Sequence, residues 1–163
     1  MIFESLNELE ILKIARGIEE TGYKFYMDAA EKFGKDEAKE MFLYLAADEQ
    51  DHIKTFQNLY DRIANDPSRE EHVYEETMTA YLKAISETSI FHTRGITESG
   101  LANIATVRDA LYIGIQAEKD SILFYEGILK NTKNEFTKKV LDRLIKEEVK
   151  HLHNLKVLMD EAE

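Results

Sequence analysis

The sequence predicts an all-α fold: a four-helix bundle with one long crossover between the second and third bundle helices. The 163 residues include one proline and seven glycines, whereas a many-stranded sheet would need more frequent turn residues. Apolar residues recur at steps of three and four along four long segments. The middle link between these segments is about 40 residues long and the outer two are short, which is the connectivity of a bundle with a single crossover. We expect residues 1–163 to form one domain.

Start and stop signals place the elements along the chain. Ser5 with Glu8 has the spacing of a capping box, and Gly34 is a natural stop for the first helix. Thr106 with Asp109 predicts another helix start after the crossover. The expected helical segments are approximately 5–33, 36–65, 74–90 within the crossover, 106–130 and 135–159, and the most loop-like stretch is 93–100.

Charge and composition exclude several classes of protein. The formal net charge of −11 disfavours binding to nucleic acid or to anionic membranes. The chain has no cysteine, so it holds no disulfide, thiolate zinc site or cysteine-ligated iron–sulfur cluster. It also lacks a signal-peptide pattern and a run of about 18 apolar residues that could span a bilayer. We therefore expect a cytoplasmic protein.

Each of the four long segments has a glutamate in the middle of an otherwise apolar or small seam. These glutamates are Glu19, Glu49, Glu118 and Glu148. A buried carboxylate without a partner costs several kcal/mol, so four in one core require compensating positive charge, which two divalent cations would supply. The opposing interpretation places these glutamates on the surface, but their apolar neighbours fix the register of the seams. That surface interpretation does suit Glu20, Glu126 and Glu147, which lie off the seams.

An internal repeat strengthens the prediction of a metal site. Glu19, Glu49 and His52 recur 99 positions later as Glu118, Glu148 and His151. Each half therefore separates its two glutamates by 30 residues and places a histidine three residues after the second one. A single Glu-x-x-His arises by chance in charged helices, whereas two in matching context indicate two similar helical hairpins that face each other.

The residue types indicate a bimetal centre. Glutamate and histidine at positions i and i+3 share one helix face, so Glu49 and Glu148 can bridge two metals while each histidine binds one. Glu19 and Glu118 are then terminal ligands. Mixed carboxylate and imidazole ligation favours two iron ions per chain, with manganese as an alternative.

Residues beside the predicted ligands are candidates to support them. Tyr26 and Tyr125 follow the terminal glutamates by two helical turns, so their hydroxyls can hydrogen-bond ligand carboxylates or simply pack in the core. Asp48 and Glu147 precede the bridging glutamates and can hold the histidine rings, or else lie on a solvated face.

At these residues the sequence resembles the rubrerythrin family of the ferritin-like superfamily, over about residues 8–65 and 106–160. The motifs that carry the resemblance are Ala15-x-x-x-Glu19-x-x-Gly22-x-x-Phe25-Tyr26, Asp48-Glu49-x-x-His52, Glu118 to Phe124-Tyr125, and Glu148-x-x-His151. The resemblance implies a ferritin-like bundle, a di-iron centre that reduces hydrogen peroxide, and a homodimer. Dioxygen is the other oxidant that we consider, and re-reduction of the centre requires an external electron donor.

Two departures from the family pattern bear on function. Ser121 stands where rubrerythrins usually carry an extra glutamate, and the four-cysteine rubredoxin module is missing. The remaining six-residue symmetry also resembles bacterioferritin, although Gln50 stands in place of its haem-binding methionine. A non-enzymatic iron-binding or iron-handling protein is therefore the alternative, and a structural bundle without metal is a third reading.

The crossover carries the remaining histidines and several aromatic residues. We expect His72 and His92 to be exposed or to cap helices, and His153 to point away from the metal face. The apolar crossover side chains are expected either to pack across the bundle or to form a dimer contact; they are Tyr74, Tyr81, Ile85 and Phe91.

Overall fold

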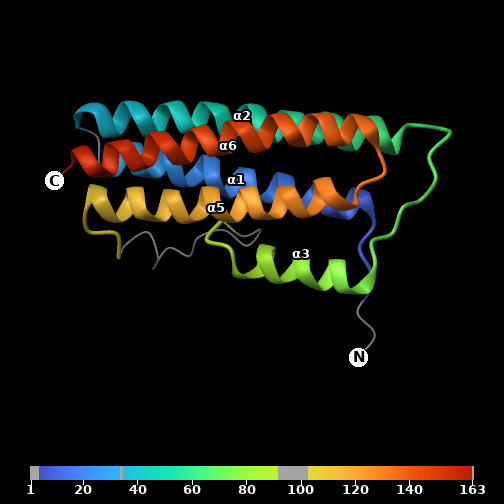
Figure 1. Cartoon of the computed structure of the whole chain (residues 1–163). Helices are drawn as coiled ribbons and strands as arrows, with labels where there is room; N and C mark the ends of the chain where they lie inside the picture. Colours follow the sequence, from blue (N-terminus) through green and yellow to red (C-terminus); the bar gives the residue numbers. More distant parts are fainter. Residues whose placement is uncertain (1–3, 34, 92–102, 163) are drawn as a thin grey trace.

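The computed structural model describes residues 4–33, 35–91 and 103–162, and within them the chain forms five helices. They are α1 (Glu8–Lys32), α2 (Asp36–Ala64), α3 (Glu76–Thr88), α5 (Val107–Asn131) and α6 (Glu135–Glu161). Four of these helices, α1, α2, α5 and α6, lie side by side as a bundle, and the shorter α3 lies along its flank (Figure 1). The predicted all-α bundle with one long crossover is confirmed.

The bundle consists of two antiparallel hairpins. α1 packs most extensively against α2, and α5 packs most extensively against α6. The two hairpins meet through smaller contacts of α1 with α5 and of α2 with α6. The crossover that contains α3 carries the chain back along the bundle, so that α2 and α5 run in the same direction (Figure 1). This arrangement brings the two halves of the sequence repeat face to face.

The start of α1 differs from the predicted capping box. Asn7, not Ser5, is the N-cap: its side chain accepts a hydrogen bond from the Glu10 N–H at 3.0 Å, and the Glu10 carboxylate accepts one from the Asn7 N–H at 2.8 Å. The prediction of Ser5 with Glu8 was wrong because Glu8 is buried and its carboxylate accepts a hydrogen bond from the Thr132 hydroxyl instead.

The other predicted helix signals have separate outcomes. The capping box of Thr106 and Asp109 is confirmed at the start of α5. α1 ends at Lys32 with Phe33 as its C-cap, whereas the predicted stop at Gly34 lies outside the described residues. The same holds for His92 and for the loop predicted over 93–100.

Both ends of α3 are attached to the bundle. Ahead of it, the Tyr74 N–H donates to the Leu6 carbonyl at 2.9 Å, beside a single β-bridge between Asn7 and Val73. Along its length, α3 packs on α5 at Gly127, where an added Cβ would lie only 2.8 Å from Leu82 Cδ2. A side chain at position 127 would therefore require the Leu82 side chain to move. The crossover residues Tyr74 and Phe91 are buried and pack into the core, which is the first of the two alternatives predicted for them.

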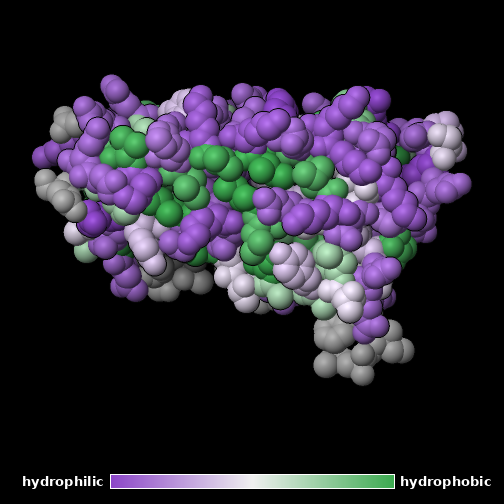
Figure 2. All heavy atoms as spheres, in the orientation of Figure 1, coloured by the Kyte–Doolittle hydropathy of each residue, from purple (hydrophilic) through white to green (hydrophobic). Residues whose placement is uncertain are grey.

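The predicted seams form the centre of the bundle. The positions that lie three or four residues apart around each predicted glutamate are buried in all four bundle helices, and Phe33, the C-cap of α1, is partly exposed. The surface in the view of Figure 2 is mostly hydrophilic, with an apolar stripe that runs over α5 and α6. Among the described helices, none combines the length and apolar character needed to cross a membrane.

Candidate metal centre

Four glutamates and two histidines meet where the seams of all four bundle helices cross. All six are buried, with at most 3 % of each residue exposed. Their side chains form two groups in which one donor atom from each member lies within 4.8 Å of the others. The first group is Glu19, Glu49, His52 and Glu148, and the second is Glu49, Glu118, Glu148 and His151. Glu49 and Glu148 belong to both groups, which is the arrangement expected of bridging carboxylates.

The two histidines face the same carboxylate from opposite hairpins. His52 Nδ1 lies 3.0 Å from Glu148 Oε1, and His151 Nδ1 lies 2.9 Å from Glu148 Oε2. The two imidazole rings are nearly parallel, with their centroids 5.7 Å apart and their planes at 23°. The two histidines of the sequence repeat are thus arranged with approximate twofold symmetry.

Two further carboxylates hold the histidine rings, and they do so crosswise. His52 Nε2 on α2 lies 3.0 Å from Glu147 on α6, and His151 Nε2 on α6 lies 2.9 Å from Asp48 on α2. A carboxylate at Nε2 keeps the proton on that nitrogen, so Nδ1 remains available as a metal ligand. Of the two alternatives predicted for Asp48 and Glu147, the structure shows the one in which they hold the rings, with each acting across the hairpin boundary.

The tyrosines also cross between hairpins. The Tyr26 hydroxyl on α1 donates to Glu118 Oε1 on α5 at 2.6 Å, and the Tyr125 hydroxyl on α5 donates to Glu19 on α1. Each tyrosine therefore binds the terminal glutamate of the opposite half. The sequence indicated that they could reach ligand carboxylates, but the identity of the partner depends on how the hairpins pack.

Without a metal, the two terminal glutamates carry protons more readily than free glutamates. Burial raises the pKa of Glu19 well above its usual value of 4.5, and the negative charges of Glu49 and Glu148 raise it further. The pKa of Glu118 is raised in the same way, first by burial and then by the charges of Glu148 and Glu49. Four buried carboxylates cannot all be ionised unless positive charge lies among them.

The histidines supply part of that charge. Burial disfavours protonated His52, but its contacts with Glu148, Glu19 and Glu49 outweigh burial and raise its pKa. The same competition raises the pKa of His151, chiefly through Glu148. Burial alone would favour neutral Glu148, yet its contacts with the two histidines lower its pKa. In the metal-free cluster, protons on these side chains therefore supply the positive charge that metal cations could supply instead.

The donor atoms fit a pair of metal ions. Glu49 Oε2, His52 Nδ1 and Glu148 Oε1 are buried and make no well-aligned hydrogen bond, although His52 Nδ1 lies 3.0 Å from Glu148 Oε1 and 3.7 Å from Glu49 Oε2. Such atoms are costly in a protein interior unless they have another partner. All three belong to the candidate ligand set, and each points into the cluster that a metal would occupy. The six residues therefore suit metal ions in number, type and position, while their individual roles as ligands stay a prediction.

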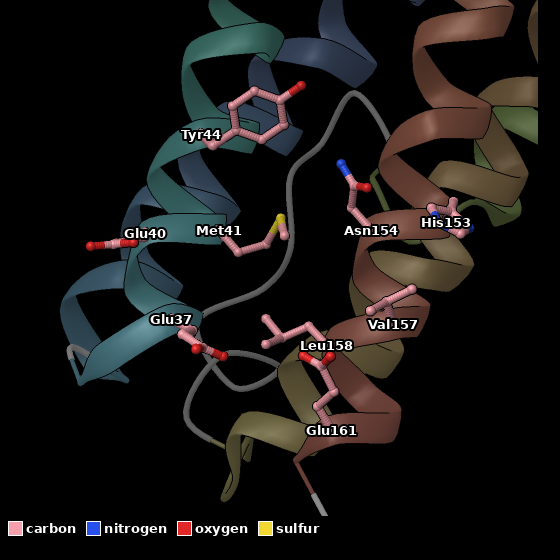
Figure 3. A pocket seen from close by; sticks show the side chains of 9 residues that line it. All are labelled: Glu37, Glu40, Met41, Tyr44, His153, Asn154, Val157, Leu158 and Glu161. Atoms are coloured by element: carbon pink, nitrogen blue, oxygen red, sulfur yellow. The ribbon is translucent and has the colours of Figure 1, made fainter.

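Two pockets follow the groove between α2 and α6 on the histidine side. The smaller, of about 220 Å³, opens over the two rings and has a polar lining of Tyr44, Asp48, Asp51, His52, Thr55, Arg143, Glu147, Lys150 and His151. The larger, of about 530 Å³, lies between the end of α6 and the start of α2, where Met41 and Leu158 extend between the helices (Figure 3). His153 is exposed there, off the metal face as predicted.

The sequence did not reveal Tyr44 as a neighbour of the cluster, and it did not place Phe91 next to the centre. Tyr44 lines both pockets, and its ring lies edge-on to His151 with centroids 6.1 Å apart. Its position four residues before Asp48, on the same helix face, is a signal that could have revealed it. Phe91 packs beside Gly22 from the crossover, and no helical periodicity could have placed it there.

A four-helix bundle with one crossover and buried Glu/His clusters on facing helices is the architecture of the ferritin-like di-metal carboxylate proteins. The family model described as Rubrerythrin matches residues 10–159, and the chain belongs to the rubrerythrin family. A crystal structure of a proposed ferritin-like diiron-carboxylate protein from Thermotoga maritima shares the fold, with a TM-score of 0.78. It is 24 % identical, and the match covers 99 % of this chain and 100 % of that one. No curated protein matches the chain.

Proposed function

We propose that the protein is a di-iron oxidoreductase whose centre reacts with hydrogen peroxide or dioxygen. One observation carries this proposal: two donor groups share Glu49 and Glu148, and three of their buried donor atoms make no hydrogen bond. Carboxylate-rich sites with one imidazole per metal suit iron, with manganese as the alternative. Two ferrous ions held there would supply the two electrons that reduce peroxide to water.

The residues of the chain have distinct tasks in this proposal. Glu19 and His52 would hold one metal, Glu118 and His151 would hold the other, and Glu49 and Glu148 would bridge the two. Asp48 and Glu147 orient the imidazoles, and Tyr26 and Tyr125 fix the terminal carboxylates by hydrogen bonds. These last four residues keep the donor atoms in place between the oxidised and reduced states.

Re-reduction of the centre requires an electron donor from outside the chain. The sequence has no cysteine and thus no rubredoxin-type iron site of its own. The groove between α2 and α6 is the side on which histidines lie nearest the surface, since Asp48 and Glu147, their hydrogen-bond partners, have side chains 34 % and 39 % exposed. We propose that electrons enter on this side.

Ser121 supports a second candidate, a non-enzymatic iron-handling protein. It is buried on α5 one turn after Glu118, where rubrerythrins usually carry a further glutamate, so one carboxylate ligand is missing. Storage of iron would require a hollow shell of many subunits, whereas we propose a homodimer. The solution mass from size-exclusion chromatography with light scattering separates these two assemblies.

The decisive experiment is anaerobic loading with ferrous iron followed by rapid mixing with oxidant. We expect about two iron ions per chain and an absorbance change on mixing with peroxide or air that is complete at one peroxide per pair of ions. A Glu20→Gln variant, which removes an exposed glutamate next to Glu19, is the matched control and should behave as wild type. Iron uptake without any reaction with either oxidant would favour the iron-handling candidate.

A further inference from the structure

Next to Gly22 of α1, the Phe91 side chain lies beside the centre. Phe91 follows α3 and is only 3 % exposed. Its ring lies against Gly22 of α1, one turn after Glu19: a Cβ atom added to Gly22 would be 3.1 Å from Phe91 Cδ2 and 3.3 Å from Glu49 Cδ. The ring and the bridging carboxylate thus approach the same point, and they can do so because residue 22 has no side chain.

Aromatic contacts hold the Phe91 ring in this position. It packs against Phe25 with centroids 5.1 Å apart, and it stands edge-on to Tyr26 at 5.7 Å with the planes at 87°. Tyr26 in turn donates its hydroxyl hydrogen bond to Glu118. The ring therefore lies among side chains that contact the carboxylates of both halves.

The backbone next to Phe91 is attached to α5. The Ile90 N–H donates a hydrogen bond to Asp120 Oδ2 at 3.2 Å, and the Ser89 hydroxyl donates to the Ser86 carbonyl at 3.2 Å. Asp120 directly precedes Ser121, which is the repeat counterpart of Gly22, 99 positions later. Gly22 on α1 and Ser121 on α5 are thus small, buried residues at matching positions of the repeat.

The two sides of the centre differ in chemistry. On the α2–α6 side, two stacked imidazole rings and a polar pocket stand in front of the carboxylates. At Gly22 there is no ligand ring, and the aromatic side chain of Phe91 occupies the space next to Glu49. A molecule that reacts beside Glu49 on this side must therefore fit into the space that the Phe91 ring does not occupy.

We propose that Phe91 is the specificity-determining residue of the centre, limiting it to small oxidants and excluding bulky organic hydroperoxides. The inference rests on the proposed function. Reduction of a peroxide ROOH breaks the O–O bond, takes one electron from each of two ferrous ions, which become ferric, and two protons from the solvent, and yields ROH and water. The size of the R group is what Phe91 restricts.

The test compares peroxides of different size with variants at position 91. Ferrous-loaded wild type, Phe91→Leu and Phe91→Ala are each mixed with hydrogen peroxide and with cumene hydroperoxide, and the ratio of the two rate constants is measured. We expect the rate constant with cumene hydroperoxide, divided by that with hydrogen peroxide, to be at least tenfold higher in Phe91→Ala than in wild type. Phe91→Leu should give an intermediate value. Asp120→Ala, which leaves the ring intact but removes its anchor, should raise the ratio less.

The matched control is Phe124→Ala. Phe124 is as buried as Phe91 and packs on Tyr125, so its removal makes a cavity of similar size away from Gly22. The ratio of its rate constants with the two peroxides should remain that of wild type. An equal rise in Phe124→Ala would mean that general loosening of the core, and not the position of Phe91, controls access.

A second readout does not depend on any reaction. With manganese(II) in the centre, the relaxation rate of water protons reports how closely water approaches the metal. We expect this rate to increase in Phe91→Ala and to stay at the wild-type value in Phe124→Ala. An unchanged rate together with an unchanged peroxide ratio would overturn the role of Phe91. A wild-type protein that reacts with no oxidant would overturn the proposed function, while the relaxation measurement would still decide on Phe91.

Discussion

At the scale of single residues, the shared and unshared glutamates predict different losses of metal. Glu49 and Glu148 belong to both donor groups, whereas Glu19 belongs to one. Substitution by glutamine keeps the shape and removes the charge. Glu49→Gln and Glu148→Gln should therefore weaken both metal positions, and Glu19→Gln should mainly weaken one. Titration with manganese or ferrous iron under anaerobic conditions counts the ions; loss of a single ion in all three variants would contradict the bridging roles.

The tyrosine hydroxyls give a second prediction at this scale. Tyr26→Phe removes the hydrogen bond to buried Glu118 and leaves a carboxyl oxygen with one partner fewer. A buried hydrogen bond contributes about 1 kcal/mol to stability, more when a charged group is involved. We expect the free energy of unfolding of the metal-free protein to fall by about 1–2 kcal/mol, as measured by urea denaturation. The control is Tyr112→Phe, at a position that is 57 % exposed, and it should have no measurable effect.

At the scale of helices, the crossed carboxylate–histidine pairs join α2 to α6. Loss of such an outer partner typically lowers metal affinity by 10–100-fold. Asp48→Asn and Glu147→Gln should each weaken binding by about that factor, because neither amide holds the Nε2 proton as a carboxylate does. Asp51→Asn is the matched control, since Asp51 lines the same pocket but its side chain is 74 % exposed. Equal weakening in all three variants would indicate a general effect of pocket charge.

The helices and the seams could be predicted from the sequence because local patterns determine them. Apolar spacing fixed which face of each helix is buried, and it placed Glu19 and His151 correctly in the interior. The start of α1 was placed wrongly because Ser5 and Asn7 are both good N-caps. Tertiary contacts decide between them: Glu8 accepts a hydrogen bond from Thr132, and Asn7 forms a β-bridge with Val73.

Contacts between elements could not be predicted from the sequence. The crossed partners of the tyrosines and histidines depend on how the hairpins dock, and a repeat shows that two halves are alike without showing which side chain reaches across. Phe91 is the clearest case, because it lies in an irregular segment with no period to follow. Gly22 was visible as a small residue in a seam, but its closeness to Phe91 was not.

At the scale of the whole molecule, the metal-free protein should lose stability as pH rises. Glu19 and Glu118 have raised pKa values, so their contribution is fully present below the unfolded value of 4.5 and is lost as pH rises through the folded values. His52 and His151 act in the same direction above their unfolded value of 6.5. The lowered pKa of Glu148 matters only below about pH 4.5, since its contribution is lost as pH falls. Between pH 5 and 8 the melting temperature should therefore decrease.

The metal-loaded protein should show the opposite trend, because metal ions bind deprotonated carboxylates and neutral imidazoles, and affinity rises with pH. Binding to the folded state adds RT ln(1 + [M]/Kd), about 2.7 kcal/mol when free metal is 100 times Kd. Calorimetry of metal-free and manganese-loaded protein at pH 5, 6.5 and 8 should thus give melting temperatures that diverge as pH rises. In the double variant Glu19→Gln, Glu118→Gln the two raised carboxyl groups no longer titrate, so the metal-free slope should flatten. Between pH 5 and 6.5, where the histidines do not contribute, a wild-type slope that persists in this variant would assign the pH dependence to the net negative charge, which grows with pH, and not to Glu19 and Glu118.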